Sequence, residues 1–317
     1  MGHGPISQEV LLAKTETTYN TDPTPTVGTN AILIRRVDAR LDRLRMIDRG
    51  AVRASLGTLQ QIYAGALRAI SFEAEVKGSG AAGTVPELDP LLKACGMGAT
   101  IVASTSVTYA PASTSISSCT LWWYESVGGA NVLHKMTGCR GTCALTFKAG
   151  DIVVARFDMV GKPTTVTDVS TPSPTYSSVV PIGIRNLSTT LNAVANLVIQ
   201  NFSLSLNNSI DVPDSVIDTN GFGNIVITKR DVQLMLQKHA EPVATIDSFA
   251  HLTAGTAIAF ASGTLGSTAG NRLALNCGQM HVRDIAPGED ANMRVRTLTC
   301  GAHETSTADT EFTLVFT

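Results

Sequence analysis

Apolar and polar residues alternate along most of the chain, which is the pattern of β-strands with one buried face. These segments begin near the start with AILIRRVDARLDRLR, end with EFTLVFT, and are separated by turn-forming residues. Two stretches instead have helical spacing: PELDPLLKACGM, stopped at Gly96, and TIDSFAHLTAG, stopped at Gly255. The pattern therefore predicts a mainly β protein with two short helices.

Residues 134–151 contain two cysteines four positions apart, so this stretch could be a metal site, a redox pair or a plain strand. With a period of two, Cys139 and Cys143 share a face with Leu145. Residues four apart along a strand lie about 13 Å apart, whereas a disulfide requires Cα atoms within about 7 Å. The six cysteines and six histidines offer no second ligand pair. We therefore expect a strand with buried thiols, without a required disulfide or a metal site.

Composition restricts the possible functions. The 317 residues are 44% apolar, enough for a sizeable core, and carry a net charge of −2, which gives no basic surface for gripping nucleic acid. No window approaches 18 consecutive apolar residues, so we expect no membrane span and, from the N-terminal pattern, no export signal. Cysteines without a disulfide framework fit assembly in a reducing cytoplasm.

Residues 161–181 contain four prolines and many serines and threonines, and they predict a linker between a domain at 1–160 and a second at 182–317. The two sides can be aligned in order, which favours an internal duplication, although alternation alone also produces chance matches. The aligned pairs are Arg36–Leu41 with Asn201–Leu206, Ala69–Val76 with Lys229–Leu236, Ala94–Gly96 with Thr253–Gly255, and Ala149–Asp151 with Pro287–Glu289.

The segment from Gly78 to Gly83 has the glycine spacing of a dinucleotide-binding loop. However, the strand before it alternates, whereas a parallel strand of that fold is apolar on both faces. Residues 84–86 separate the glycines from the helix, and no acidic residue for the ribose occurs between Asp89 and Glu125. We expect a flexible loop, no cofactor and no enzymatic activity.

Long strands with a polar face indicate contact with solvent or with another chain, and an ordinary solvated sheet is the simpler interpretation. Asp38, Arg40 and Asp42 share one such face, and Ser71, Glu73, Glu75 and Lys77 share another. Trp122 and Trp123 are adjacent and therefore point to opposite faces. One is expected in the core and the other at solvent or at a neighbouring subunit.

Four segments occur in the order found in major tail tube proteins of tailed bacteriophages, especially those with long non-contractile tails. They are KGSGAAGTVPELDPLLKACGM, the turn Tyr109-Ala-Pro111, CTLWWYES and KMTGCRGTCALTFKAGD. The chain resembles this family from about Ala69 to Gly161. The resemblance implies a β-sandwich with a flanking short helix, and stacked rings whose long hairpins close into a β-barrel around a DNA-wide lumen. Alternatives are a bacterial secretion-system tube of the same fold and a dinucleotide-dependent enzyme.

The resemblance implies a structural protein of the virion tail, assembled in the host bacterial cytoplasm, with itself and other tail proteins as partners. DNA would pass during ejection without specific binding, because acidic side chains repel phosphates, with Arg40 and Lys77 softening that field. The strands on either side of residues 47–65 would form the lumen-lining hairpin. The lumen-facing candidates are Asp38, Arg40, Asp42, Ser71, Glu73, Glu75, Ser203, Ser205 and Asn207.

The chain departs from the family in length, since a single tube domain would end near Gly161. If the second half repeats the tube domain, three chains complete a ring of six domains. If it decorates the tail exterior instead, six chains are needed.

Overall fold

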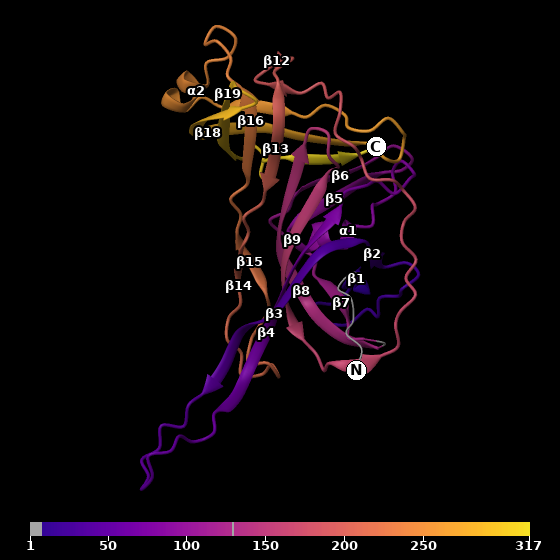
Figure 1. Ribbon diagram of the computed structural model, residues 1–317, viewed down its shortest axis with the longest axis vertical. Coiled ribbons are helices and arrows are strands. Elements are labelled where there is room, and N and C mark those ends of the chain that lie inside the picture. The colour runs from indigo at the N-terminus through magenta and orange to yellow at the C-terminus, as the bar shows by residue number, and fades with distance from the viewer. Residues whose placement is uncertain (1–7, 129) are drawn as a thin grey trace.

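The computed structural model describes residues 8–128 and 130–317. They form an elongated body from which one hairpin projects as a long arm (Figure 1). The strands in the first half are β1 (Val10–Thr15), β2 (Ala31–Ile32), β3 (Ile34–Ile47), β4 (Ile62–Glu75), β5 (Met97–Val102), β6 (Ser106–Pro111), β7 (Cys119–Ser126), β8 (Asn131–Lys148), β9 (Val154–Pro163) and β10 (Thr167–Val169). Those in the second half are β11 (Thr190–Leu191), β12 (Val194–Ala195), β13 (Ile199–Ser205), β14 (Ser209–Asp211), β15 (Val226–Lys229), β16 (Gln233–His239), β17 (Ile258–Ala261), β18 (Leu273–Asp290), β19 (Met293–Ala302) and β20 (Thr313–Phe316).

Eight strands form one continuous antiparallel sheet that crosses from the first half of the chain to the second. Their order is β3, β4, β9, β8, β13, β16, β19, β18. The pairing of β8 with β13 is the junction between the halves, and it joins Ala144–Lys148 to Asn201–Ser205. We call this array the main sheet.

Two long strands turn out of the main sheet and build the second layer of a β-sandwich. β8 and β18 have 18 residues each. The first part of β8 pairs with β7, which pairs with β1, while the first part of β18 pairs with β17 and β20. β20 also pairs with β6, so the last strand of the chain ties the second half to the first. One large hydrophobic core lies between the layers and includes residues from both halves.

The two helices end where their sequences predict. α1 (Asp89–Ala94) begins with a proline in its first turn and is followed by Gly96 at a φ of 83°. α2 (Ser248–Ala254) is capped by the Asp247 carboxylate, which accepts the Ala250 N–H, and ends at Gly255 in the left-handed conformation. α1 contacts β1, β5, β7 and β8, and α2 contacts β18. Neither helix, nor any other in the described ranges, is long and apolar enough to cross a bilayer.

The predicted mainly β class is confirmed, as are the strand at 134–151, both helices and the long hairpin around residues 47–65. The irregular connection between the halves starts later than the composition indicated. β9 continues to Pro163, and β10 pairs with β8, so the chain becomes irregular only after Val169. It then runs along one side of the body to the second half (Figure 1). The division into domains at 1–160 and 182–317 stays a prediction.

Candidate lumen and assembly surfaces

The strand order of the main sheet occurs twice, and each copy contains an equivalent row of four core-facing residues. The first row is Val37, Phe72, Phe157 and Cys143, on β3, β4, β9 and β8. The second row is Phe202, Leu236, Leu298 and Ile285, on β13, β16, β19 and β18. Every neighbour within a row is a direct cross-strand partner. The rows therefore show which positions of the two halves correspond.

The sequence alignment matches the rows at some positions and differs at others, and the internal duplication itself stays a prediction. The alignment and the rows both match Val37 with Phe202, and Gly96 and Gly255 both follow a helix. The alignment placed Phe72 against Val232, whereas the row has Leu236 there, four residues later. It also placed Pro287–Glu289 against the turn after β8. The turn after β18 lies instead at residues 291 and 292, because both of these adopt positive φ.

One face of β4 is buried and the other is polar, as its alternation predicts. Ile70, Phe72 and Ala74 are fully buried in the core. Ser71 and Glu73 on the opposite face remain partly exposed, as does Glu75. We call the face that carries Ser71 the polar face of the main sheet.

The polar face continues across neighbouring strands of the first half. Asp38 is the direct partner of Ser71, whose hydroxyl donates to Asp158 Oδ1 at 2.6 Å. Thr142 follows on β8 opposite Asp158. Because Asp38, Ser71, Asp158 and Thr142 are successive cross-strand partners, the polar face extends over four strands.

The acidic groups on this face lie beside arginines. Arg35 pairs with Glu75 at 2.9 Å, and Arg156 pairs with Asp158 at 3.1 Å. The Arg36 guanidinium lies 3.9 Å from Glu73. The expected field of acidic side chains is therefore balanced by arginines that the sequence analysis did not assign to this face.

Lys77 does not moderate that field, contrary to the sequence expectation. Its side chain is only 2% exposed, and its ammonium lies 3.3 Å from the Glu87 carboxylate. Burial raises the pKa of Glu87, and the Lys77 charge opposes that rise. The alternation of β4 ends at Glu75, so the face of Lys77 is set by the following loop instead.

In the second half, the polar face is uncharged on β13 and carries an acidic residue on β18, where Asp284 pairs with Thr299. Ser203 lies between Thr146 and Met235, and Ser205 lies between Ala144 and Gln233. Asn207 lies two residues beyond the end of β13, is exposed, and donates to the Asp231 carbonyl at 3.1 Å. Ser203 and Ser205 therefore lie on the polar face of the main sheet, beside Thr146 and Ala144 of β8.

Arg40 and Asp42 lie where the arm leaves the body. Arg40 is exposed opposite Ala69, and Asp42 is half-buried opposite Leu67. Leu67 is completely buried in a small cluster with Val212, Phe222 and Ile225. The loop between β14 and β15 therefore covers the polar face at this end, next to Asp42. Whether the nine candidate residues face a lumen stays a prediction.

The junction between the halves is tightly packed. The rings of Phe147 on β8 and Phe202 on β13 stack with centroids 4.5 Å apart and an interplanar angle of 11°. Phe202 also packs edge-on against Phe260, 5.1 Å away. Aromatic pairs of this kind add to the energy of area burial, so the two halves are joined by side chains as well as by backbone pairing.

Both edges of the main sheet are open in the described chain. β3 pairs there only with β4, and residues 281–290 of β18 pair only with β19. Unpaired edges of long strands are templates for another strand. The β3 edge carries Arg35, Arg36 and Arg40, and the tip of β18 carries Asp284, Glu289 and Asp290. The two edges therefore differ in charge as well as in position.

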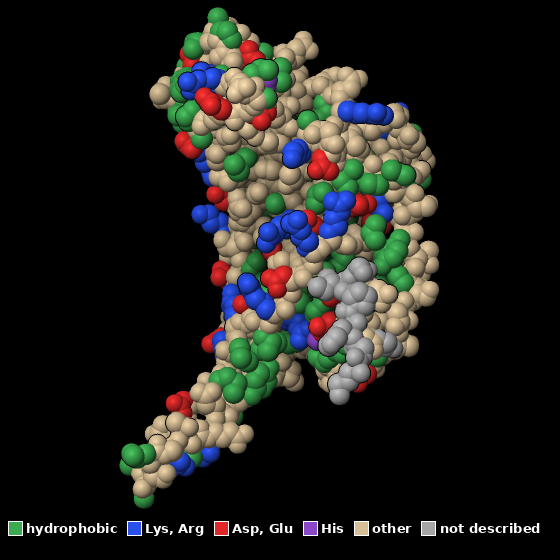
Figure 2. All heavy atoms as spheres, viewed as in Figure 1, with side chains coloured by type: hydrophobic (Ala, Val, Ile, Leu, Met, Phe, Trp, Pro, Cys, Tyr) green, Lys and Arg blue, Asp and Glu red, His purple; other side chains and the backbone are tan. Residues whose placement is uncertain are grey.

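The arm comprises the outer parts of β3 and β4 and the loop of residues 48–61 between them. Figure 2 shows it standing clear of the body. Its large exposed hydrophobic residues are Leu41, Leu44, Met46, Ile47, Val52, Leu56, Ile62 and Tyr63. So many exposed apolar side chains on one projection are typical of an interaction surface.

A family model described as phage tail tube protein matches residues 7–312, nearly the whole chain. The chain belongs to the phage tail tube protein family. No curated protein matches it. Members of this family are structural components of the virion tail that assemble with copies of themselves and with other tail proteins into a tube. The resemblance noted in the sequence is confirmed.

The cysteines of this tail tube chain are all buried and free. Cys139 and Cys143 lie on the core face of β8, and Cys139 is the direct cross-strand partner of Cys119. Burial raises the pKa of the Cys139 thiol well above its usual range, with Cys119 adding to the effect. The Cys95 thiol donates to Met159 Sδ at 3.8 Å, and burial raises its pKa as well, with Cys143 adding to the effect. The thiols are therefore neutral residues of the tail tube core, and they are closer to one another than their spacing in the sequence indicates.

The glycine segment Gly78–Gly83 is a loop that docks on the second half of the tail tube chain. Gly78 N–H donates to Asn271 Oδ1 at 2.8 Å, and Gly80 N–H donates to the Gly270 carbonyl at 3.0 Å. A side chain at Gly78 would collide with the Gly270 carbonyl. The glycines are thus explained by close backbone packing.

The tryptophans divide as expected. Trp123 packs in the core, and its ring stacks on His134 with centroids 4.8 Å apart. Trp122 lies on the other face, where the Lys135 ammonium sits 3.7 Å from the ring centroid.

Sequence reasoning missed the open tip of β18 and the loop that covers Leu67, because both depend on contacts between distant segments. The acidic residues at the end of β18 were the available signal for the first of them.

Proposed function

We propose that three copies of this chain close into a ring, and that rings stack into a tail tube through which DNA passes without specific binding. The observation that carries this proposal is the junction inside the chain, where β8 of the first half pairs with β13 of the second. The same pairing between chains would join β18 of one copy to β3 of the next, since these are the equivalent strands and both have open edges.

The internal junction defines the register of the junction between chains. Phe202 pairs with Phe147, which lies four residues after Cys143 in the first row. The equivalent partner of Val37 is then four residues after Ile285, at Glu289. Counting back along the antiparallel pair places Arg40 opposite Ala286. The same count places Arg36 opposite Asp290, a favourable pair, and Asp42 opposite Asp284, a like-charge pair at the base of the arm.

The open edge of β18 also limits pairing with unrelated strands. Pro287 supplies no N–H to a ladder, and Asp284, Glu289 and Asp290 are charged. Proline and charged residues are devices by which open edges avoid unspecific association. A partner strand must therefore bring complementary charge, which the arginines of β3 provide.

Three copies are the smallest number that admits a DNA duplex. Eight strands per chain give 24 in a ring, and at about 4.8 Å per strand the barrel is about 37 Å across before strand tilt widens it. A layer of side chains about 5 Å deep leaves a bore of about 27 Å. Two copies would leave about 14 Å, which is too narrow for a duplex.

The polar face would line this bore. Its carboxylates are balanced by arginines in the first half, and its second half carries Ser203, Ser205 and threonines. A surface with little net charge neither binds a phosphate backbone strongly nor releases many counterions. DNA could therefore move along it without being held.

Disulfide crosslinking tests both register and copy number. Arg40→Cys and Ala286→Cys in one chain place two exposed thiols opposite each other across the proposed junction, whereas all six native thiols are buried. Oxidation of assembled tubes should give covalent dimers and trimers and nothing larger. Each single variant, and Arg40→Cys combined with Thr297→Cys one strand further away, should give no such ladder.

A ladder that continues to six chains would refute the three-membered ring and favour a second half that decorates the exterior. Assembled tubes in which the designed pair does not crosslink would refute the register. A purified protein that stays monomeric at every concentration, with virions that lack it, would contradict the tube itself.

A further inference from the structure

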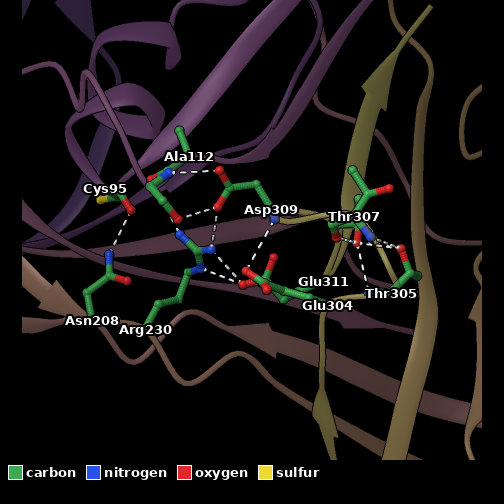
Figure 3. Close-up of polar contacts among 11 residues, drawn as sticks. Cys95, Ala112, Asn208, Arg230, Glu304, Thr305, Thr307, Asp309 and Glu311 are labelled. Carbon is green, nitrogen blue, oxygen red and sulfur yellow. Dashed lines mark hydrogen bonds and ion pairs between the residues drawn. The ribbon is translucent and has the colours of Figure 1, made fainter.

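Three carboxylates converge on the segment between β19 and β20, outside the main sheet. They belong to Glu304, Asp309 and Glu311. Figure 3 shows Asp309 and Glu311 bonded to the guanidinium of Arg230, and Glu304 bonded to the Asp309 N–H. Arg230 lies between β15 and β16, so the cluster joins parts of the chain about 80 residues apart. Three negative groups and one positive group leave an excess of two negative charges.

Arg230 satisfies only part of this cluster. Its Nε and one terminal nitrogen both donate to Glu311 Oε1, at 2.9 and 2.6 Å, and that terminal nitrogen also donates to Asp309 Oδ1 at 3.0 Å. A parallel arginine–carboxylate pair would use both oxygens of the carboxylate. Here Glu311 Oε2 has no hydrogen-bond partner among residues 8–128 and 130–317 although it is buried, and the Glu311 side chain is only 10% exposed. An unpaired buried carboxylate oxygen is costly, and a bound cation is one way to satisfy it.

The spacing fits a divalent cation of the size of calcium. One oxygen from each of the three carboxylates lies within 4.8 Å of the others. Two oxygens bound to one calcium at about 2.4 Å can be at most about 4.8 Å apart, whereas magnesium at about 2.1 Å requires a tighter octahedron. We propose that Glu304, Asp309 and Glu311 bind one calcium ion, with Glu311 Oε2 as its buried ligand. This departs from the sequence expectation of no metal, which considered cysteine and histidine ligands.

A cation here would stabilise the seam between the two halves. Asp309 accepts the Ser113 N–H at 3.0 Å, and Arg230 donates to the Ala112 carbonyl at 3.4 Å, so the cluster already contacts the end of β6. β20 begins two residues after Glu311 and pairs with both β6 and β18. Calcium would therefore fix the segment that positions the last strand between the first and second halves.

Calcium titration of the full-length protein tests the proposal. Three protein ligands with water completing the shell indicate a Kd of about 10⁻⁴–10⁻³ M. Calorimetry should detect one calcium per chain, and about 10 mM calcium should raise Tm by about 2–4 °C. Magnesium at the same concentration and ionic strength should give a clearly smaller shift.

Glu304→Gln is the decisive variant, because Glu304 is exposed and its only bond is with the Asp309 N–H, which an amide oxygen can still accept. It should bind calcium about tenfold more weakly and keep about a third to a half of the Tm shift. Asp168→Asn makes the same charge change at an exposed site on β10 and should keep the full shift. The proposal is overturned if the wild type binds no calcium, if Glu304→Gln keeps the full shift, or if Asp168→Asn loses it equally.

Discussion

The arm offers the sharpest test of how rings stack, through the double variant Val52→Ser, Leu56→Ser. Both side chains are fully exposed in the single chain, at 103% and 107% of their reference areas. Replacing them removes no contact in the folded chain, so its free energy of unfolding should change by less than about 0.5 kcal/mol. Ring closure should also be unaffected, because the proposed ring closes through β3 and β18 near the body.

The association of one ring with the next should weaken strongly if the arm inserts into the next ring. Burial of a valine or leucine side chain contributes about 1.5–3 kcal/mol, so the two substitutions remove about 3–6 kcal/mol per arm. This corresponds to a loss of roughly 10²- to 10⁴-fold in the association constant for each arm. The figure is an upper bound, since part of the buried area in any interface is offset by the ordering of side chains.

Sedimentation velocity and negative-stain microscopy distinguish separate rings from tubes, and the double variant should give separate rings. Val180→Ser is the matched control, because Val180 is 73% exposed but lies on the connection between the halves. It should form tubes like the wild type. Double-variant tubes of normal length and stability would refute the role of the arm, and loss of rings together with tubes would show that the arm acts in ring closure instead.

Two further predictions concern the single chain. Phe202→Ala should lower the free energy of unfolding by about 3–5 kcal/mol in a urea titration, because Phe202 packs against Phe147 and Phe260 in the core. Ser203→Ala is the control. A loss below about 1 kcal/mol for Phe202→Ala would contradict a packed junction. Burial lowers the pKa of His134, with Arg68 adding to this and Glu125 opposing it, so its contribution to stability is present above about pH 6.5 and is lost as pH falls further. His134→Gln should therefore reduce the stability lost between about pH 7.5 and 5.5, by up to about 1.4 kcal/mol per pH unit, and an unchanged pH slope would refute this.

Local patterns were sufficient to predict the elements themselves. Alternation predicted β8 and the inner part of β4 because one face of each is buried, and burial in a sheet imposes a period of two. Gly96 and Gly255 marked the helix ends because both adopt positive φ after the last helical turn.

Contacts between distant segments could not be predicted from those patterns. Lys77 continues the polar face of β4 by period, but the strand has ended at Glu75. Its partner Glu87 is ten residues further along the chain, and alternation cannot assign that contact. Glu87 becomes its partner only because the loop before α1 folds back. The arginines that balance Glu73 and Glu75 come from β3, across a strand pair whose bulges shift the register between Arg35 and Val37.

The two hairpins of one chain correspond in position but differ in form, and this has a consequence for the tube. The first hairpin has strands of 14 residues and a free loop, whereas the second is interrupted after Ser205 and continues as the short pair β14 and β15. Its loop lies against the base of the first arm, where Asp214 pairs with Arg45, and a side chain at Gly65 would collide with the Asn220 carbonyl.

In the proposed ring, the barrel would therefore repeat six times while only three arms project. The second hairpin braces the arm of its own chain and is not available for stacking in the same way. If the arms make the contacts between rings, those contacts have threefold symmetry, so successive rings can be related by steps of 120° but not of 60°. A tube built from six identical hairpins would allow both, so in the proposed tube the inequality of the two halves would remove that ambiguity.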